Sequence, residues 1–174
     1  MTKVLVVSDS SSLILMAKAE LLKIACQQFI VEIPTEVYQE AVTAGKELNK
    51  ADAFIIEQAI KKEKIIVKEV KEKKTGNDLI LLGLGKGEEA AIQLYLQEKA
   101  QLLLIDDLPG IQAAKMLEVA WVTAVSLTVK FVEKKKITRE EGMDCLKILQ
   151  KNGRYRLDFI SEAANEIEKL KEVK

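Results

Sequence analysis

The chain has 174 residues, enough for one domain or for one domain with a helical appendage. Hydrophobic residues make up 48% and charged residues 31%, a balance that allows a packed core and argues against disorder. Lys+Arg and Asp+Glu both number 27, so the formal net charge of zero neither favours nor excludes a nucleic-acid partner. The absence of histidine excludes Ser-His-Asp and Cys-His catalysis and every imidazole metal site.

The two cysteines, Cys26 and Cys145, lie far apart among apolar neighbours and lack zinc-type spacing. We therefore expect both to be buried free thiols. No stretch resembles a signal peptide, and no apolar run approaches the roughly 20 residues that span a bilayer. These features predict a protein of the reducing cytoplasm with no membrane partner.

The first part of the chain alternates apolar runs with helical patterns. Residues 3–8 (KVLVVS) are a β-branched run typical of a buried strand. Asp9 and the serines after it supply helix N-cap chemistry, and apolar residues then recur at helical spacing through Ala25. Residues 29–33 predict a second strand, and Thr35 is the expected N-cap of the next helix.

The alternation continues through the middle of the chain. Residues 50–62 predict an amphipathic helix, and residues 65–67 a brief strand. The charged residues 68–78 are predicted to form a solvated connector, and residues 79–87 lead into a helix from Glu88 to about residue 99. The side chains expected to face inward from the helix over 50–62 are Phe54, Ile55, Ala59 and Ile60.

The clearest later strand is residues 101–105 (QLLLI), which ends at Asp106-Asp107. A helix through residue 116, a short strand over 119–122 and a helix over 124–132 follow. Beyond the basic residues 134–136 the pattern is purely helical. It begins with a capping box of Thr138 and Glu141, and Gly153 suits a helix C′ position. The inward residues of the final helix are predicted to be Leu157, Ile160, Ala164, Ile167 and Leu170.

Alternating strands and helices predict the α/β class, with a mostly parallel sheet covered on both faces. We divide the chain into an α/β domain, residues 1–136, and a C-terminal two-helix extension, residues 137–174. The extension is expected to pack on the domain or on a second copy.

Acidic residues follow two of the predicted strands, where parallel sheets bind ligands. Asp9 follows the first strand, and Asp106-Asp107 follow the QLLLI strand. A carboxylate there can also be a simple helix N-cap, but clustered carboxylates repel and need a compensating cation. Without histidine, that cation is held through oxygen ligands, which selects Mg²⁺ or Mn²⁺. The helical carboxylates Glu40 and Glu88 are candidates to complete the site, although each alone is typical of a surface glutamate.

Four stretches of the sequence carry a family resemblance. They are VVSDSSSLI (residues 6–14), IPTEVYQEAV (33–42), LGLGKGEEAAI (82–92) and LLLIDDLPGIQAAKML (102–117). Their order and spacing resemble the small prokaryotic branch of PIN-domain proteins, in which an opening Asp-Ser-Ser-Pro-Leu-Ile is followed by signatures like VYxEV, LGxGExEAI and LLxDDxxAR. The resemblance covers roughly residues 3–130. It implies a three-layer α/β/α Rossmann-like PIN fold whose acidic quartet binds Mg²⁺ or Mn²⁺.

The resemblance also assigns residues. Asp9, Glu40 and Glu88 match the first three acids, and Asp107 fits the fourth position slightly better than Asp106. Ser10 matches the small hydroxyl residue after the first acid, as a substrate-contacting residue.

This chain departs from the branch at three places. Ser12 replaces a proline, Ala90 stands where a second glutamate is common, and Pro109-Gly110 replace basic residues. Because the later glutamate is missing, the metal site either uses Glu88 or is partly degraded.

The family implies a metal-dependent endoribonuclease that hydrolyses RNA phosphodiesters with Mg²⁺- or Mn²⁺-activated water. Many small prokaryotic members are toxins of toxin–antitoxin pairs, which implies an antitoxin protein as partner, and homodimers are common among them. The alternative is a catalytically weak PIN-like module that binds RNA or protein, which Ala90 favours.

Several cationic and aromatic residues are further candidates for RNA contact. Lys86 lies beside a glycine turn where it could meet a substrate phosphate. The candidates for contact with the RNA backbone are residues 134–136, Arg154 and Arg156. Tyr155 is a candidate for base stacking, whereas Trp121 in its apolar strand is predicted to be core. Ordinary surface charge is the competing interpretation for the cations.

Overall fold

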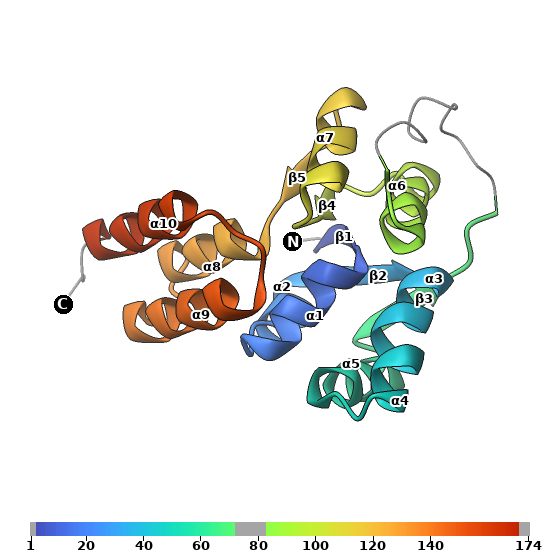
Figure 1. Cartoon of the computed structure of the whole chain (residues 1–174), viewed down its shortest axis with the longest axis horizontal. Helices are drawn as coiled ribbons and strands as arrows, with labels where there is room; N and C mark the ends of the chain where they lie inside the picture. Colours follow the sequence, from blue (N-terminus) through green and yellow to red (C-terminus); the bar gives the residue numbers. More distant parts are fainter. Residues whose placement is uncertain (1–2, 72–82, 171–174) are drawn as a thin grey trace.

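The computed structural model describes residues 3–71 and 83–170 (Figure 1). Five parallel strands form one sheet in the order β3-β2-β1-β4-β5. Strand order therefore reverses between the neighbours β1 and β4, as in doubly wound folds. The strand bounds are β1 Val4–Ser8, β2 Phe29–Pro34, β3 Ile65–Lys68, β4 Leu102–Leu104 and β5 Trp121–Val122.

Helices cover both faces of the sheet, which confirms the predicted three-layer α/β/α architecture. Adjacent strand residues point to opposite faces: Val6 and Leu104 belong to one hydrophobic cluster, and Val7 and Leu103 to the other. Helices α6 (Lys86–Glu98) and α7 (Leu108–Met116) cover the second face. The first face packs against α1 (Ser10–Lys18), α2 (Leu22–Gln28), α5 (Ala51–Lys61) and the C-terminal helices α8 (Ala124–Glu133), α9 (Arg139–Asn152) and α10 (Leu157–Lys169).

The helical pattern predicted to run from Asp9 to Ala25 is two helices, α1 and α2. Glu20 adopts a left-handed conformation (φ 60°) between them, and Leu21 donates its N–H to the Met16 carbonyl at 2.9 Å. This turn lets Leu21 enter the core, where it is fully buried.

Thr35 does not cap the next helix, so that prediction is wrong. Pro34 occupies the N-cap and Thr35 begins α3 (Thr35–Tyr38), while its hydroxyl donates to the Lys68 carbonyl at 3.3 Å. The helix continues as the π-helical segment η1 (Gln39–Ala44) and as α4 (Gly45–Glu47). Glu40 lies on the π-helical turn, a kind of irregularity frequent at functional sites.

Helix α5 is rotated from the predicted orientation. Ala53 and Ile56 are buried, whereas Phe54 and Ile55 are 43% and 48% exposed. The same kind of difference occurs in α10, where Ile160 and Ile167 are buried but Leu157 is exposed. In both helices apolar residues occupy more than one face. Their spacing in the sequence therefore does not predict which of them are buried in the core.

The two helices of the C-terminal extension pack against α8, beside which they lie in Figure 1. The predicted capping box is present, with Thr138 and Glu141 each accepting a backbone N–H of the other. Cys145 anchors α9 on the domain by donating its thiol hydrogen to the Ala19 carbonyl at 3.2 Å. Both cysteines are buried and free, as predicted, and burial raises the pKa of Cys145 to about 11. The boundary placed at residue 136 stays a prediction.

No helix within the described ranges is both long enough and apolar enough to cross a membrane. Residues 72–78 of the predicted connector and residues 79–82 of the segment that leads into the next helix lie outside the described residues.

Candidate metal centre

Acidic side chains converge beyond the carboxyl ends of β1 and β4, at the reversal of strand order. Asp9 directly follows β1, and Asp106-Asp107 follow β4 after one residue. The Asp9 N–H donates to the Leu104 carbonyl at 3.1 Å, so the ladder fixes the two strand ends against each other. Parallel sheets bind ligands at this crevice.

Asp9 is fully buried, yet only one of its oxygens is satisfied. Oδ1 accepts the Ser12 N–H at 2.8 Å, which caps α1, while Oδ2 is buried without a hydrogen-bond partner. Burial raises the pKa of Asp9 well above its ordinary value of 3.8, the hydrogen bond from the Ser12 N–H opposes the rise, and the charges of Asp106 and Asp107 add to it. The ionised form of a carboxylate with a buried, unpaired oxygen is costly unless a cation neutralises it, and otherwise the group takes up a proton.

Glu88 and Asp107 complete a group with Asp9. One oxygen from each of the three carboxylates lies within 4.8 Å of the others. Glu88 stands in the first turn of α6, where its Oε2 accepts the Gly85 N–H at 2.7 Å. Asp107 is the N-cap residue of α7 and accepts a hydrogen bond from the Ser11 hydroxyl.

The negative charges of Asp9, Glu88 and Asp107 lie close enough together that a bound cation would stabilise their ionised forms. Burial is the main cause of the raised pKa of Glu88, and the charges of Asp107 and Glu40 raise this pKa further. Three half-buried or buried carboxylates with only oxygen donors suit Mg²⁺ or Mn²⁺, which prefer such ligands. The residues present therefore fit a divalent metal.

Glu40 lies at the edge of this group. One of its oxygens accepts from the Ser10 hydroxyl and the other from the Gly87 N–H at 3.1 Å. It is not among the three residues whose oxygens come within 4.8 Å of one another. Gly87 is needed for this approach, because a Cβ there would lie 3.0 Å from Glu40 Cδ and 2.5 Å from the Ser10 hydroxyl.

The two adjacent aspartates point in different directions. Asp107 faces Asp9 and Glu88, whereas both oxygens of Asp106 accept the Ala124 N–H at 3.1 Å. Asp106 Oδ1 also accepts from the Tyr155 hydroxyl. Burial raises the pKa of Asp106, and these hydrogen bonds oppose the rise. Asp106 thus joins the start of α8 and the loop after α9 to the end of β4.

Of the two residues predicted to contact substrate, Ser10 holds Glu40, and Lys86 is exposed at the first position of α6. Ala90 is buried on the inner side of α6. Ala90 has no side-chain oxygen to offer a metal, whereas Glu88, two residues earlier, belongs to the acidic group.

Acidic, cationic and aromatic side chains together line a cavity of about 810 Å³ beside the acidic group. Lys115, Trp121 and Arg154 lie along it together with Glu88 and Asp107. A second cavity of about 240 Å³ is lined by Ser11, Lys18, Asp107 and Arg154. Trp121, predicted to be core, is half-buried, with the Lys115 ammonium 5.6 Å from its ring centroid.

A family model described as a PIN domain matches residues 5–170, a span that includes α9 and α10. No curated protein matches. Among solved structures, a PilT N-terminus domain protein from the hyperthermophilic archaeon Sulfolobus solfataricus P2 is similar at 22% identity and a TM-score of 0.48, over 69% of this chain and 87% of that chain. Because the family model spans most of its length, the chain belongs to the PIN-domain family.

Proposed function

We propose that the chain is a Mg²⁺- or Mn²⁺-dependent endoribonuclease. The observation that carries the proposal is the group of Asp9, Glu88 and Asp107, together with the buried oxygen of Asp9 that has no hydrogen-bond partner. PIN domains are typically metal-dependent nucleases, and the chain's fold and acidic group agree with that class.

Asp9, Glu88 and Asp107 are the residues that would hold the metal. When bound, the ion would supply Lewis-acid activation of water and of the phosphodiester. Glu40 would keep Ser10 and the first turn of α6 in place through its hydrogen bonds to Ser10 and Gly87. Ser12 would hold Asp9 in one rotamer through its N–H, at a position where the family pattern has proline, which has no N–H to donate.

RNA is the proposed substrate because the cavity beside the acids carries cations suited to phosphates. Among the residues that the structure describes, Arg154 has no ion-pair partner, whereas Arg156 pairs with Asp158 at 2.6 Å. Arg154 lines both of the cavities that Asp106 and Asp107 line. An unpaired guanidinium beside an acidic metal site suits a phosphate of a bound strand.

The decisive experiment measures cleavage of a mixed pool of single-stranded and structured RNA in Mn²⁺, with Asp9→Asn as the matched variant. We expect cleavage by the wild type and a loss of at least about 100-fold in the variant. Equal degradation of the RNA pool by the wild type and by Asp9→Asn would contradict the proposal. RNA binding by the wild type without Mn²⁺-dependent cleavage would instead support the catalytically weak binding module.

We further propose a cytoplasmic homodimeric toxin with a protein antitoxin as its partner. A short antitoxin-like gene immediately upstream, growth arrest on expression and relief on co-expression of that gene would support this role. A gene standing alone, whose expression leaves growth unchanged, would remove the toxin proposal while leaving the nuclease proposal intact.

A further inference from the structure

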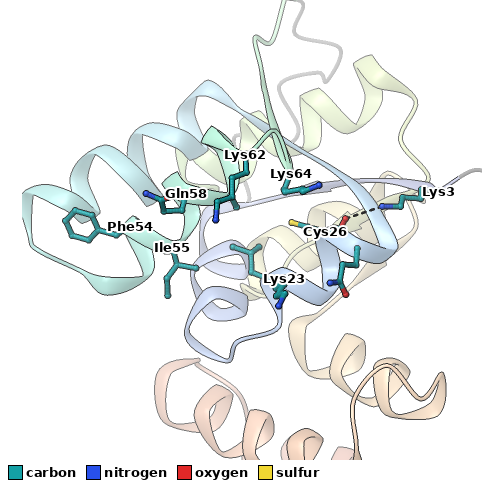
Figure 2. A pocket seen from close by; sticks show the side chains of 11 residues that line it. Lys3, Lys23, Cys26, Phe54, Ile55, Gln58, Lys62 and Lys64 are labelled. Carbon is teal, nitrogen blue, oxygen red and sulfur yellow. Dashed lines mark hydrogen bonds between the residues drawn. The ribbon is translucent and has the colours of Figure 1, made fainter.

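A groove of about 700 Å³ lies between α2 and α5, away from the acidic group (Figure 2). Its lining includes Lys3, just before β1, Gln27, shortly before β2, and Lys64, just before β3. The groove therefore lies at the amino ends of these parallel strands, whereas the acidic group follows the carboxyl ends of β1 and β4. Its volume is within the range of roughly 300–1,000 Å³ that is usual for small-molecule sites.

The floor of the groove is apolar. On α2 the lining residues Leu22 and Cys26 are one helical turn apart and buried in the core, and on α5 Ile55 and Ala59 have the same spacing. Phe54 and Ile55, in the first half of α5, are 43% and 48% exposed. Large apolar side chains exposed beside an apolar hollow are typical of a binding surface.

The two ends of the groove differ in character. Figure 2 shows Phe54 and Ile55 toward one end, and Lys3 and Lys64 toward the other. Lys3 donates to the Cys26 carbonyl at 3.4 Å. Burial raises the pKa of the Cys26 thiol, and the charges of Lys3 and Lys64 oppose the rise, so both ammonium groups lie near this thiol. The groove is thus apolar at one end and cationic at the other.

The lysines of the groove have no acidic partner in it. No aspartate or glutamate of the described ranges lines the groove. Lys23, Lys62 and Lys64 make no ion pair with another described residue, whereas the adjacent Lys61 pairs with Glu57 at 3.1 Å. Because the whole chain has a net charge of zero, this collection of one sign is local. An anion bound at this end would meet several cations at once.

We propose that the groove binds a free single-chain anionic amphiphile, an aliphatic carboxylate. The chain would lie along Ile55 and Ala59 toward Phe54, and the carboxylate would lie toward Lys3 and Lys64. A ligand without charge would gain nothing from the lysines, and a compact anion such as inorganic phosphate would gain nothing from the apolar floor. The site is separate from the nuclease proposal, because the described residues that line the groove and the cavities beside the acidic group do not overlap.

The test uses the full chain without added metal and follows ¹⁵N amide shifts in titrations with octanoate, decanoate and octanol, each below its aggregation concentration. Each buried methylene group tightens binding by about fourfold, so decanoate should bind at least about tenfold more tightly than octanoate. Octanoate should bind at least about threefold more tightly than octanol, which has the same chain without the charge. The shifts should concentrate on α2 and α5.

Variants of exposed lysines test the cationic end. Lys3→Gln with Lys64→Gln should weaken octanoate binding at least about threefold, to the affinity of octanol. The same double variant should bind octanol within about twofold of the wild type, which shows that the fold and the apolar floor are intact. Lys136→Gln with Lys151→Gln removes two exposed lysines outside the groove and should leave octanoate binding within about twofold.

A variant of α5 tests the apolar end. Ile55→Asp should weaken the binding of all three ligands about tenfold, because it places a charge beside the chain. Met116→Asp changes an exposed apolar residue outside the groove and should leave binding within about twofold.

Four outcomes would overturn the proposal. One is equal affinity for octanoate and octanol, and another is a set of amide shifts that lies away from α2 and α5. The third is binding to phosphatidylglycerol vesicles without binding of free decanoate, which would make the groove a membrane contact. The fourth is a wild-type dimer that dissociates in Ile55→Asp, because a second copy would then cover the groove. None of these measurements depends on RNA cleavage, so a failure here is distinguishable from a failure of the nuclease proposal.

Discussion

The Tyr155 hydroxyl donates a hydrogen bond to Asp106 Oδ1, which joins the loop between α9 and α10 to the carboxyl end of β4. Gly153 makes room for this contact, because a Cβ there would lie 2.7 Å from Tyr155 Cδ2. The φ of Gly153 is −96°, so this residue does not adopt the left-handed conformation of a C′ glycine. A glycine is needed here because the Tyr155 ring packs close to the backbone of residue 153. This hydrogen bond connects the C-terminal helices to the loop that carries Asp107. The same segment places Arg154 in the lining of the 810 Å³ cavity beside the acidic group.

Tyr155→Phe should destabilise the protein by about 1–3 kcal/mol, because it removes a donor from a buried carboxylate. Tyr155 lowers the pKa of Asp106, so the loss affects the ionised form and should grow as the pH rises from 4 to 8. Thermal unfolding across that range measures it. Tyr95→Phe is the control, because Tyr95 packs on the core and its hydroxyl makes no side-chain hydrogen bond within the described part of the chain. An equal loss of stability in Tyr155→Phe and Tyr95→Phe would show that the hydrogen bond from Tyr155 to Asp106 does not stabilise the protein.

Asp106→Asn and Asp107→Asn should separate the two aspartates. Asp107→Asn removes a carboxylate of the acidic group and should weaken Mn²⁺ binding at least tenfold. Asp106→Asn should leave Mn²⁺ affinity within about threefold, because its oxygens are occupied by Ala124 and Tyr155. Isothermal titration calorimetry with Mn²⁺ checks both. The reverse ranking of the two variants would move the metal site to Asp106.

Arg154→Ala should weaken the binding of single-stranded RNA and reduce the slope of log K against log salt by about 1. The reason is the loss of one cation beside the acidic group. Binding is measured in Ca²⁺ or EDTA, to separate it from cleavage, at several salt concentrations. Lys151→Ala, in the same helical extension but outside both cavities, should leave the slope unchanged. A slope unaffected by Arg154→Ala would exclude this residue from the RNA contact.

The sequence predicted the parts of the site that depend on continuous strands. The apolar runs before Asp9 and Asp106 are long and uninterrupted, so the strands and the acidic ends were evident, and the parallel order brings those ends together. Which of two adjacent aspartates faces the site depends on Ala124 and on Tyr155, which is 49 residues away in sequence. The family motif favours Asp107 slightly, but neither strand nor helix periodicity carries that information.

The orientation of α5 was missed for a similar reason. The segment has apolar residues on more than one side, and the choice of Ala53 and Ile56 as the buried pair comes from how α5 packs against α1 and η1. The contact between Gly87 and Glu40 was also missed, although a glycine one residue before a candidate acid is a signal that could have indicated it.

Gly87→Ala should lower Mn²⁺-dependent cleavage about 10- to 100-fold, because the added methyl group displaces Glu40 and Ser10. Stability should change little, since alanine favours the first turn of α6 and offsets part of the clash. Gly85→Ala is the matched control: its Cβ would lie 3.5 Å from Glu88 Oε2, an ordinary contact, and cleavage should stay within about threefold. Similar cleavage by both variants would show that Glu40 does not need its present position.

Asp9→Asn should stabilise the metal-free protein, and the gain should grow with pH. Burial raises the pKa of Asp9 above 3.8, so between the unfolded and folded pKa values the folded state holds a proton that the unfolded chain releases. The free energy of unfolding of the wild type therefore falls as the pH rises through that window, and the ionised Asp9 is a cost at higher pH. We expect the variant's Tm to exceed that of the wild type by about 3–6 °C at pH 8 and to match it near pH 4.

Mn²⁺ should reverse this order, because only the wild type gains stability from binding the ion at Asp9. Asp158→Asn provides a control of opposite sign, since Arg156 lowers the pKa of the exposed Asp158. An ionised carboxylate with a lowered pKa favours folding above that pKa, so Asp158→Asn should lose stability, slightly, as the pH rises. A Tm difference between wild type and Asp9→Asn that did not change with pH would contradict the prediction. It would show that the ionised Asp9 carboxylate does not destabilise the metal-free protein.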